Sequence, residues 1–272
     1  MEWTFQKFSL KIGSFIPLAK GQTMTGTLSG RTALITGSTS GIGRATATAL
    51  SDRGAHVILT GRDTARGDAA VQQLRAGGAK ADFIAADLTD AASARALAAT
   101  ALELSGGRID ILVNNAGIFP FGPTDATIEP DFDAVFAVNV KVPYFLVAAL
   151  APQMAARGNG AIVNVTTMVA DIGMAEMGLY GSTKAALVLL TKSWAAEFGP
   201  SGVRVNAVSP GPTRTEGTAG MGEALDQLAA GAPATRPGTP EEIAAAITYL
   251  AGDDASFIHG AVLPVDGGRL AV

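Results

Sequence analysis

The chain has 272 residues, of which 48% are hydrophobic and 16% charged, and its formal net charge is −4. This size suits one α/β domain with a sizeable core, and the slight negative charge gives no general attraction for nucleic acid or an anionic membrane. Cysteine is absent, which excludes disulfides, thiolate chemistry and sulfur-ligated metals. The two histidines, His56 and His259, lack the paired spacing of a metal site, so we expect structural roles for both and no bound metal.

Residues 1–28 differ in character from the rest of the chain. They carry four aromatic residues but no basic start followed by a continuous apolar block, so a secretory signal is not predicted. We expect a loosely ordered extension over residues 1–28 and a single domain over residues 29–272. No apolar run approaches the roughly 18 residues that a membrane span needs, so we expect a cytoplasmic protein without membrane association.

From Gly30 onward, short β-rich runs alternate with alanine-rich helical stretches. Strands are predicted at 32–36, 56–60, 81–86, 109–113, 161–165, 203–208 and 261–265. Amphipathic helical patterns lie between them, for example over 63–78 and 90–107, the second closing on a glycine pair. Near-continuous apolar strands separated by helices indicate a parallel sheet covered on both faces. The prediction is a doubly wound α/β fold with seven strands, in which a ligand binds at the carboxyl ends of the strands.

The first predicted strand runs into a glycine-rich turn, TGSTSGIG (36–43), and then into a helix. Gly37, Gly41 and Gly43 permit a tight turn and a close approach of the backbone to a pyrophosphate. The helix offers free N–H groups and the positive end of its dipole to such an anion. The spacing G-x-x-x-G-x-G differs from the commoner G-x-G-x-x-G, and glycine turns also occur for structural reasons, so the motif alone leaves dinucleotide binding open.

The second predicted strand ends in HVILTGRD, where an NAD site would place an acidic residue on the ribose 2′-hydroxyl. Here Gly61 is followed by Arg62, whose guanidinium could pair with a 2′-phosphate or be an ordinary surface group. Asp63 also fits the N-cap of the next helix. The sequence therefore favours NADP(H) over NAD(H).

Tyr180 and Lys184 stand four residues apart among small residues in YGSTK. At helical spacing they share one face. A free phenol has a pKa of about 10, and a neighbouring ammonium is expected to bring it down toward a useful range for proton transfer. As an isolated pattern, a half-buried tyrosine and a solvated lysine would be the simpler interpretation.

The pattern is not isolated, and the chain closely resembles the short-chain dehydrogenase/reductase family from about residue 29 to 270. The motifs that carry the resemblance, in order, are TGSTSGIG (36–43), NNAG (114–117), Asn139 with Val140, YGSTK (180–184) and SPGPTRT (209–215). The resemblance implies a Rossmann fold with strand order 3-2-1-4-5-6-7 and a nicotinamide cofactor. It also implies hydride transfer between that cofactor and a carbonyl or secondary alcohol.

The resemblance further assigns roles to individual residues. Tyr180 would be the general acid or base, Lys184 would tune it and hold the nicotinamide ribose, and Asn139 would anchor a water of a proton relay. Asp87 would bond the adenine. The cofactor-binding residues implied in this way are Gly37, Ser38, Thr39, Ser40, Gly41, Ile42, Gly43, Arg62, Asp87, Leu88, Asn114, Ala116, Gly117, Lys184, Pro210, Gly211, Thr213 and Thr215.

The sequence departs from the family pattern at Thr167, where a serine usually polarises the substrate carbonyl. Threonine offers the same donor and acceptor, and its extra methyl restricts χ1 and occupies part of the pocket. We expect retained chemistry and a narrower substrate entrance. A β-branched residue that merely ends a strand is the weaker interpretation.

These features predict an NAD(P)(H)-dependent oxidoreductase that acts on a small ketone or alcohol. Methionines and phenylalanines in the loops after NNAG and NVTT and after PGPTRT favour a moderately apolar substrate. One alternative is a 3-oxoacyl-carrier-protein reductase, because FIHGAVLPVDGG resembles the tail of that branch, although the basic patch expected for an acidic partner is thin. Another is a cofactor-binding protein with little or no turnover. A homotetramer or homodimer is expected from the resemblance and from the apolar C-terminal segment.

Overall fold

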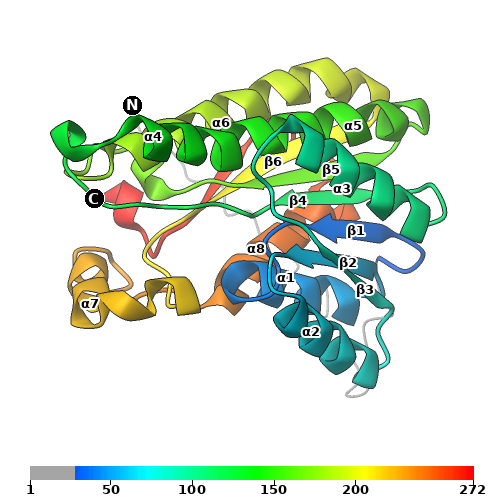
Figure 1. Ribbon diagram of the computed structural model, residues 1–272, viewed down its shortest axis with the longest axis horizontal. Helices are drawn as coiled ribbons and strands as arrows, with labels where there is room; N and C mark the ends of the chain where they lie inside the picture. Colours follow the sequence, from blue (N-terminus) through cyan, green and yellow to red (C-terminus); the bar gives the residue numbers. More distant parts are fainter. Residues whose placement is uncertain (1–27) are drawn as a thin grey trace, which may run out of the picture.

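Seven parallel strands form the centre of the molecule in the computed structural model, which describes residues 28–272 (Figure 1). Their order is β3-β2-β1-β4-β5-β6-β7, and each neighbouring pair is parallel, which confirms the predicted doubly wound fold. The strands are β1 (Thr32–Ile35), β2 (His56–Gly61), β3 (Ala81–Ala85), β4 (Ile111–Asn114), β5 (Gly160–Val165), β6 (Val203–Pro210) and β7 (Val262–Val265).

The described chain has eight α-helices, six of which cover the two faces of this sheet. They are α1 (Gly41–Asp52), α2 (Thr64–Ala76), α3 (Ala91–Leu104), α4 (Glu129–Phe136), α5 (Val142–Ala156), α6 (Gly178–Phe198), α7 (Glu223–Ala230) and α8 (Pro240–Ala251). Helices α1, α2 and α8 cover one face, and α3, α5 and α6 cover the other, as Figure 1 shows. Helix α7 projects beyond the carboxyl edge of the sheet.

The alternation of side chains along each strand explains why both faces are apolar. In β1, Ala33 and Ile35 pack with α1 and α8, whereas Leu34 packs with α3 and α5 on the other face. All three side chains are fully buried. Because successive residues of a strand point to opposite faces, a sheet covered on both sides needs the near-continuous apolar runs found in the sequence.

The predicted helices at 63–78 and 90–107 are confirmed as α2 and α3, and each begins at an acidic N-cap. The side chain of Asp63 accepts a hydrogen bond from the backbone N–H of Arg66, and Asp90 accepts one from Ser93. An N-cap of this kind satisfies backbone donors that have no partner inside the helix. Asp63 is therefore engaged in capping α2.

Helix α4 continues through a π-helical turn, η2 (Ala137–Lys141), into α5. This 28-residue stretch, Glu129–Ala156, is the one helix of the described chain that is long and apolar enough to cross a membrane by length and composition. The sequence-based expectation of no such run overlooked it. Its second half is a core helix, in which Leu146, Leu150 and Met154 are fully buried against the sheet.

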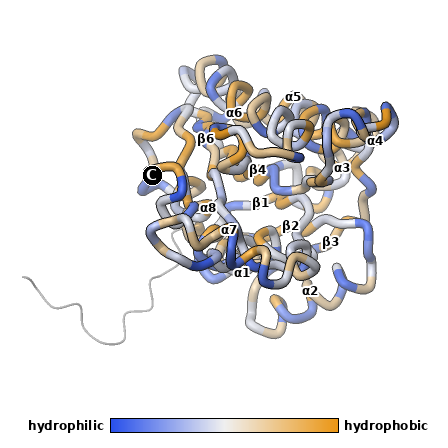
Figure 2. Tube along the Cα trace, turned by 90° about the vertical axis from the view of Figure 1, so that its left-hand side faces the viewer, coloured by the Kyte–Doolittle hydropathy of each residue, from blue (hydrophilic) through white to orange (hydrophobic). Residues whose placement is uncertain are grey.

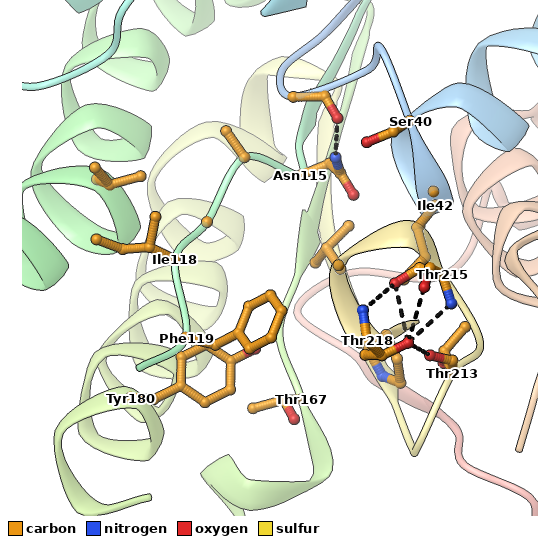
Figure 3. A pocket seen from close by; sticks show the side chains of 18 of the residues that line it. Ser40, Ile42, Asn115, Ile118, Phe119, Thr167, Tyr180, Thr213, Thr215 and Thr218 are labelled. Carbon is orange, nitrogen blue, oxygen red and sulfur yellow. Dashed lines mark hydrogen bonds between the residues drawn. The ribbon is translucent and has the colours of Figure 1, made fainter. Parts of the chain in front are cut away.

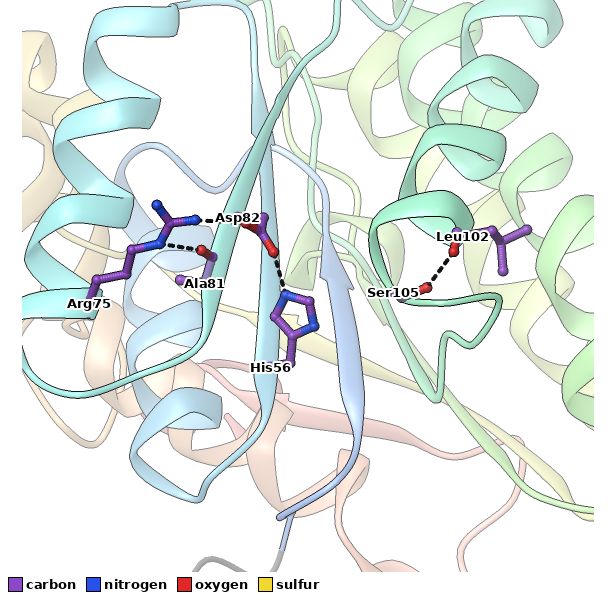
Figure 4. A network of polar contacts seen from close by, with 6 residues as sticks. All are labelled: His56, Arg75, Ala81, Asp82, Leu102 and Ser105. Atoms are coloured by element: carbon purple, nitrogen blue, oxygen red, sulfur yellow. Dashed lines mark hydrogen bonds and ion pairs between the residues drawn. The ribbon is translucent and has the colours of Figure 1, made fainter.

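A polar network lies at the amino ends of β2 and β3 (Figure 4). Asp82 joins His56 at 2.6 Å and Arg75 at 2.7 Å, and Arg75 also donates to the Ala81 carbonyl. These contacts tie α2 to two strands and support the structural role expected for His56.

The N-terminal extension predicted over residues 1–28 lies outside the described residues except at its end. Leu28 is fully buried in the core, and its backbone N–H donates to the Arg53 carbonyl at 3.0 Å. Leu28, the last residue of the predicted extension, therefore packs with the domain.

Candidate active site

A cavity of about 600 Å³ lies at the carboxyl ends of the central strands, within the range of small-molecule sites. Its walls come from the glycine turn after β1, the segments after β2 to β6, and helices α6 and α7. The predicted site residues that line it are Gly37, Thr39, Ser40, Gly41, Ile42, Arg62, Asp87, Leu88, Ala116, Gly117, Thr167, Tyr180, Lys184, Pro210, Gly211, Thr213 and Thr215. The other four, Ser38, Gly43, Asn114 and Asn139, lie behind this lining.

The glycine turn has the backbone conformation that its sequence predicts. Gly37 and Gly41 have φ values of +61° and +52°, in the left-handed region that glycine adopts without strain. A Cβ on Gly43 would overlap the Gly37 carbonyl and the Asn115 side chain. Glycine at these positions therefore lets the start of α1 pack against the turn, where Gly41 and Ile42 line the cavity.

Ser38 and Asn115 hold this turn in place. The Ser38 hydroxyl donates to the Ile35 carbonyl at 2.7 Å and accepts from the Thr60 N–H at 2.9 Å. The Asn115 amide donates to the carbonyls of Thr36 and Gly37, both at 2.9 Å. Ser38 thus fixes the turn from beneath.

The start of α1 is already paired with an acidic side chain. The Gly41 N–H donates to the Glu216 carboxylate at 2.9 Å, which brings the segment after β6 across the glycine turn. Thr215, just before Glu216, lies beside Gly41 and accepts a hydrogen bond from the Thr218 N–H (Figure 3). The Thr213 hydroxyl donates to the Gly211 carbonyl at 2.9 Å.

At the carboxyl end of β2, the cavity wall carries Arg62 and Arg66. Both are exposed, and neither forms an ion pair within residues 28–272. Asp63 also lines the cavity, but its carboxylate caps α2. Two exposed guanidinium groups at this end of the cavity suit a negatively charged group. Arg66, four residues after Arg62, was not identified from the sequence.

The two asparagines of NNAG have separate positions. Asn114 is buried in the sheet and donates to the Asn164 side chain at 2.8 Å, while Asn164 donates in turn to Thr191. Asn115 lines the cavity. Asn114 is thus bonded within the core and its neighbour Asn115 lines the cavity, and a contact of Asn114 with a cofactor stays a prediction.

Tyr180 and Lys184 lie on one face of α6, as the spacing predicts. The Lys184 Nζ is 5.9 Å from the centroid of the Tyr180 ring and donates to the Val165 carbonyl at 2.9 Å. Burial raises the pKa of Tyr180 to about 12, and the Thr167 hydroxyl beside the phenol offsets part of this rise. Burial lowers the pKa of Lys184 to about 8.

The predicted lowering of the tyrosine pKa by Lys184 is wrong for this structure. Burial disfavours both charged forms, the phenolate and the ammonium. The pKa of Tyr180 therefore rises and that of Lys184 falls, and the neutral forms are favoured over an ion pair. Around neutral pH the phenol keeps its proton and can donate it to an acceptor in the cavity.

Asn139 lies in the π-helical turn η2, directly behind Gly117. Its side-chain oxygen accepts from the Ile118 N–H at 2.9 Å, and its amide donates to the Ile118 carbonyl and to Thr183 Oγ1. A Cβ on Gly117 would lie 3.3 Å from both Asn139 Oδ1 and Lys184 Nζ. The missing side chain of Gly117 thus leaves space between these two polar atoms.

Thr167 lines the cavity at the end of β5. Its backbone is extended, with φ −169° and ψ 154°, and its hydroxyl caps the short 3-10 turn Met168–Ala170. Figure 3 shows Thr167 across from Tyr180, with the Phe119 ring beside the phenol.

Residues that sequence reasoning missed are Asn115, Thr183 and Arg66. Asn115 and Thr183 stand inside the quoted motifs NNAG and YGSTK, so their presence in a motif was the available signal. Their partners, the glycine turn and Asn139, come from distant segments, which a single sequence does not pair.

Comparisons with known proteins agree with this arrangement. A family model described as enoyl-(acyl carrier protein) reductase matches residues 37–269. An uncharacterized oxidoreductase of Thermotoga maritima is 40% identical over 250 residues, which is 89% of this chain and 98% of the relative.

Solved structures are similar over the same region. A short chain dehydrogenase/reductase family protein has 49% identity and a TM-score of 0.84, covering 90% of this chain and 100% of the other. A gluconate 5-dehydrogenase from Burkholderia cenocepacia J2315, solved in complex with NADP and tartrate, has 34% identity and a TM-score of 0.85, covering 91% and 98%.

The fold and cavity, together with these relatives, define an NAD(P)-dependent oxidoreductase that acts on CH–OH groups. The chain belongs to the short-chain dehydrogenase/reductase family.

Proposed function

We propose that this chain interconverts a ketone and a secondary alcohol, with Tyr180 as the proton donor or acceptor and NADP(H) as the favoured cofactor. The observation that carries the proposal is the placement of the Tyr180 phenol and the Thr167 hydroxyl in one cavity with the glycine turn. The direct test is NADPH oxidation by purified protein with a broad panel of ketones. NADPH binding without turnover of any of them would contradict it.

The residues present fit a dinucleotide on structural grounds. A side chain on Gly117 would fill the space beside Lys184, and one on Gly43 would collide with the glycine turn. Gly41, Thr39 and Ser40 would hold the phosphates, Asp87 the adenine, and Lys184 the nicotinamide ribose. When bound, the nicotinamide supplies the hydride that reduces a carbonyl carbon, or takes it from an alcohol carbon.

The protein's own contribution is to position and protonate the substrate oxygen. Thr167 would donate a hydrogen bond to the carbonyl, and Tyr180 would transfer its proton to that oxygen as the alcohol forms. In the reverse direction Tyr180 would receive the proton. Asn139 has its amide bonded to the protein, so its part in a proton relay would rest on positioning the segment around Lys184 or on its backbone.

Replacing Arg62 with alanine is expected to weaken NADPH binding by more than about tenfold and to leave NADH binding unchanged. The exposed guanidinium would lose its pairing with the 2′-phosphate, a charge-assisted contact worth about 1.5–3 kcal/mol. The measurement is titration of both cofactors by their fluorescence.

Lys80→Ala is a matched control, because it removes an exposed positive charge at the opposite, amino edge of β3. Equal losses of NADPH affinity in the two variants would indicate a general charge effect. Wild-type protein that binds NADH as tightly as NADPH would contradict the NADP preference.

Two substitutions of Thr167 distinguish the contribution of its hydroxyl from that of its branched shape. Thr167→Val keeps the branched shape and removes the donor, so we expect kcat/KM to fall on the order of 10²-fold. Thr167→Ser keeps the donor and removes the methyl, so activity is retained and bulkier ketones gain. Equal activity of the valine and wild-type proteins would mean that Thr167 only ends the strand.

Two alternatives stay distinguishable from this proposal. A 3-oxoacyl-carrier-protein reductase would need cations for its acidic partner. Of the candidates, Arg214 is paired with Asp226 at 2.6 Å, and Arg157 donates to the Ile109 carbonyl. A cofactor-binding protein without turnover has no use for a partly buried phenol in the same cavity as the Thr167 hydroxyl, which favours the enzyme.

The proposal also includes a homotetramer or homodimer in the cytoplasm. Exposed apolar side chains on α4, α5 and α6, namely Phe132, Tyr144 and Leu189, support burial against a second copy. Light scattering of the purified protein measures the number of subunits.

A further inference from the structure

The cavity has two ends of different chemistry. Its charged lining residues are Lys184, at the centre, and Arg62, Asp63, Arg66 and Asp87, at the ends of β2 and β3. The opposite end is formed by the segments after β4, β5 and β6 and by α7. Most side chains there are apolar, and the following are called the apolar wall: Phe119, Phe121, Met168, Val169, Met177, Met221 and Leu228.

The apolar wall is packed into a small core of its own beside the phenol. Met168, Val169 and Met177 are buried together, and Leu228 of α7 and Leu270 near the C-terminus pack against them. Figures 1 and 2 show α7 and the C-terminus on the same side of the molecule. Phe119 extends this surface, with its ring centroid 6.1 Å from that of Tyr180 and 6.5 Å from that of Phe121.

The segments that carry this wall hold more carboxylates than cations and are called the acidic rim, and one of their carboxylates, Glu216, is engaged at the Gly41 N–H. The three segments that form it, 117–128, 167–179 and 212–230, contain six carboxylates and one cation. That cation, Arg214, is paired with Asp226. An anion approaching the apolar wall would therefore meet negative charge first, and then side chains that offer no hydrogen bond to a carboxylate.

We propose that the substrate is an uncharged ketone or secondary alcohol with apolar groups on both sides of the reacting carbon, and that the apolar wall and acidic rim exclude anionic analogues. The inference rests on the proposed oxidoreductase function and names its substrate class. Sugar acids and acyl groups on an acidic carrier protein fall outside this class. Thr167 and Tyr180 supply the polar contacts that a single carbonyl oxygen needs, and thioethers let the wall adapt to different ring or chain shapes.

A pair of ketones that differ in one charged group tests the inference. We expect kcat/KM for 4-methylcyclohexanone to exceed that for 4-oxocyclohexanecarboxylate by on the order of 100-fold, because the carboxylate loses water without gaining a partner. Comparable values, or preference for the carboxylate, would overturn the inference and leave the oxidoreductase function standing. No turnover of any ketone by protein that binds NADPH would instead contradict the proposed function.

A substitution in the apolar wall tests whether this wall sets the preference for the uncharged ketone. Met221 is partly exposed on the wall, so Met221→Lys adds a cation there without emptying the core. We expect it to reduce the ratio between the two ketones at least about tenfold by raising kcat/KM for the carboxylate. Gln72→Lys adds the same charge on an exposed position of α2 and is expected to leave the ratio unchanged. Equal effects of the two variants would show that the wall does not set the preference.

Discussion

Tyr180→Phe is expected to lower kcat for ketone reduction by about 10²–10⁴-fold while NADPH binding is retained. Phenylalanine keeps the ring and its packing against Phe119 but has no proton to give. Steady-state kinetics together with cofactor titration measures the two effects separately.

The same residue determines the pH dependence in each direction. With a pKa raised to about 12, the phenol of the cofactor-free protein is protonated across the neutral range. Reduction should therefore change little with pH around neutrality, whereas alcohol oxidation, which needs the oxygen as a base, should rise with pH.

Tyr249→Phe is the matched control, since Tyr249 is exposed on α8 and does not line the cavity. We expect it to behave as wild type. A Tyr180→Phe protein with more than about a tenth of the wild-type kcat would require another proton donor.

Lys184→Met is expected to reduce kcat/KM by about 10²-fold or more and yet not to destabilise the protein at pH 7. The pKa of Lys184 falls from 10.5 to about 8 on folding, so between these values the unfolded chain binds more protons and the free energy of unfolding rises with pH. The buried ammonium therefore costs about 3 kcal/mol below pH 8. Methionine removes that cost, which offsets the lost bond to Val165.

Urea unfolding of the cofactor-free protein at pH 7 and 9.5 measures this effect. Wild type should gain stability over the interval, and Lys184→Met should lack that gain. The raised pKa of Tyr180 acts in the opposite direction only above about pH 10, so it does not interfere. Lys192→Met, on an exposed position of the same helix, controls for loss of a lysine. Equal pH dependence in the Lys184→Met and wild-type proteins would contradict the burial argument.

Sequence patterns predicted the sheet well because its strands are buried on both faces. A continuous apolar run such as that of β2 is typical of a strand inside a parallel sheet, and most of its register partners in β1 and β3 are equally apolar. Acidic residues before α2 and α3 fixed the helix starts to within a residue. Strand ends were less predictable: β4 begins two residues later than expected and β6 continues to Pro210.

The sequence predicted which residues line the candidate site better than it predicted their surroundings and hydrogen-bond partners. Tyr180, Lys184 and Thr167 line one cavity as the motifs imply. The direction of the tyrosine pKa was predicted wrongly, because the spacing of two residues carries no information on how far both are removed from water. The separate roles of Asn114 and Asn115 were equally hidden, since they depend on partners about 50 and 80 residues away.

The carboxylate of Glu216, which accepts a hydrogen bond from the Gly41 N–H, affects the free energy of anion binding at the start of α1. The positive end of the helix dipole already has a counter-ion, because the chain supplies the carboxylate of Glu216 there. A phosphate group bound at this N–H would have to replace the Glu216 carboxylate, so binding there would exchange one anion for another. The affinity for a phosphate group at this N–H then depends on the difference between its binding free energy and that of the carboxylate, rather than on the full attraction of the helix dipole for one anion.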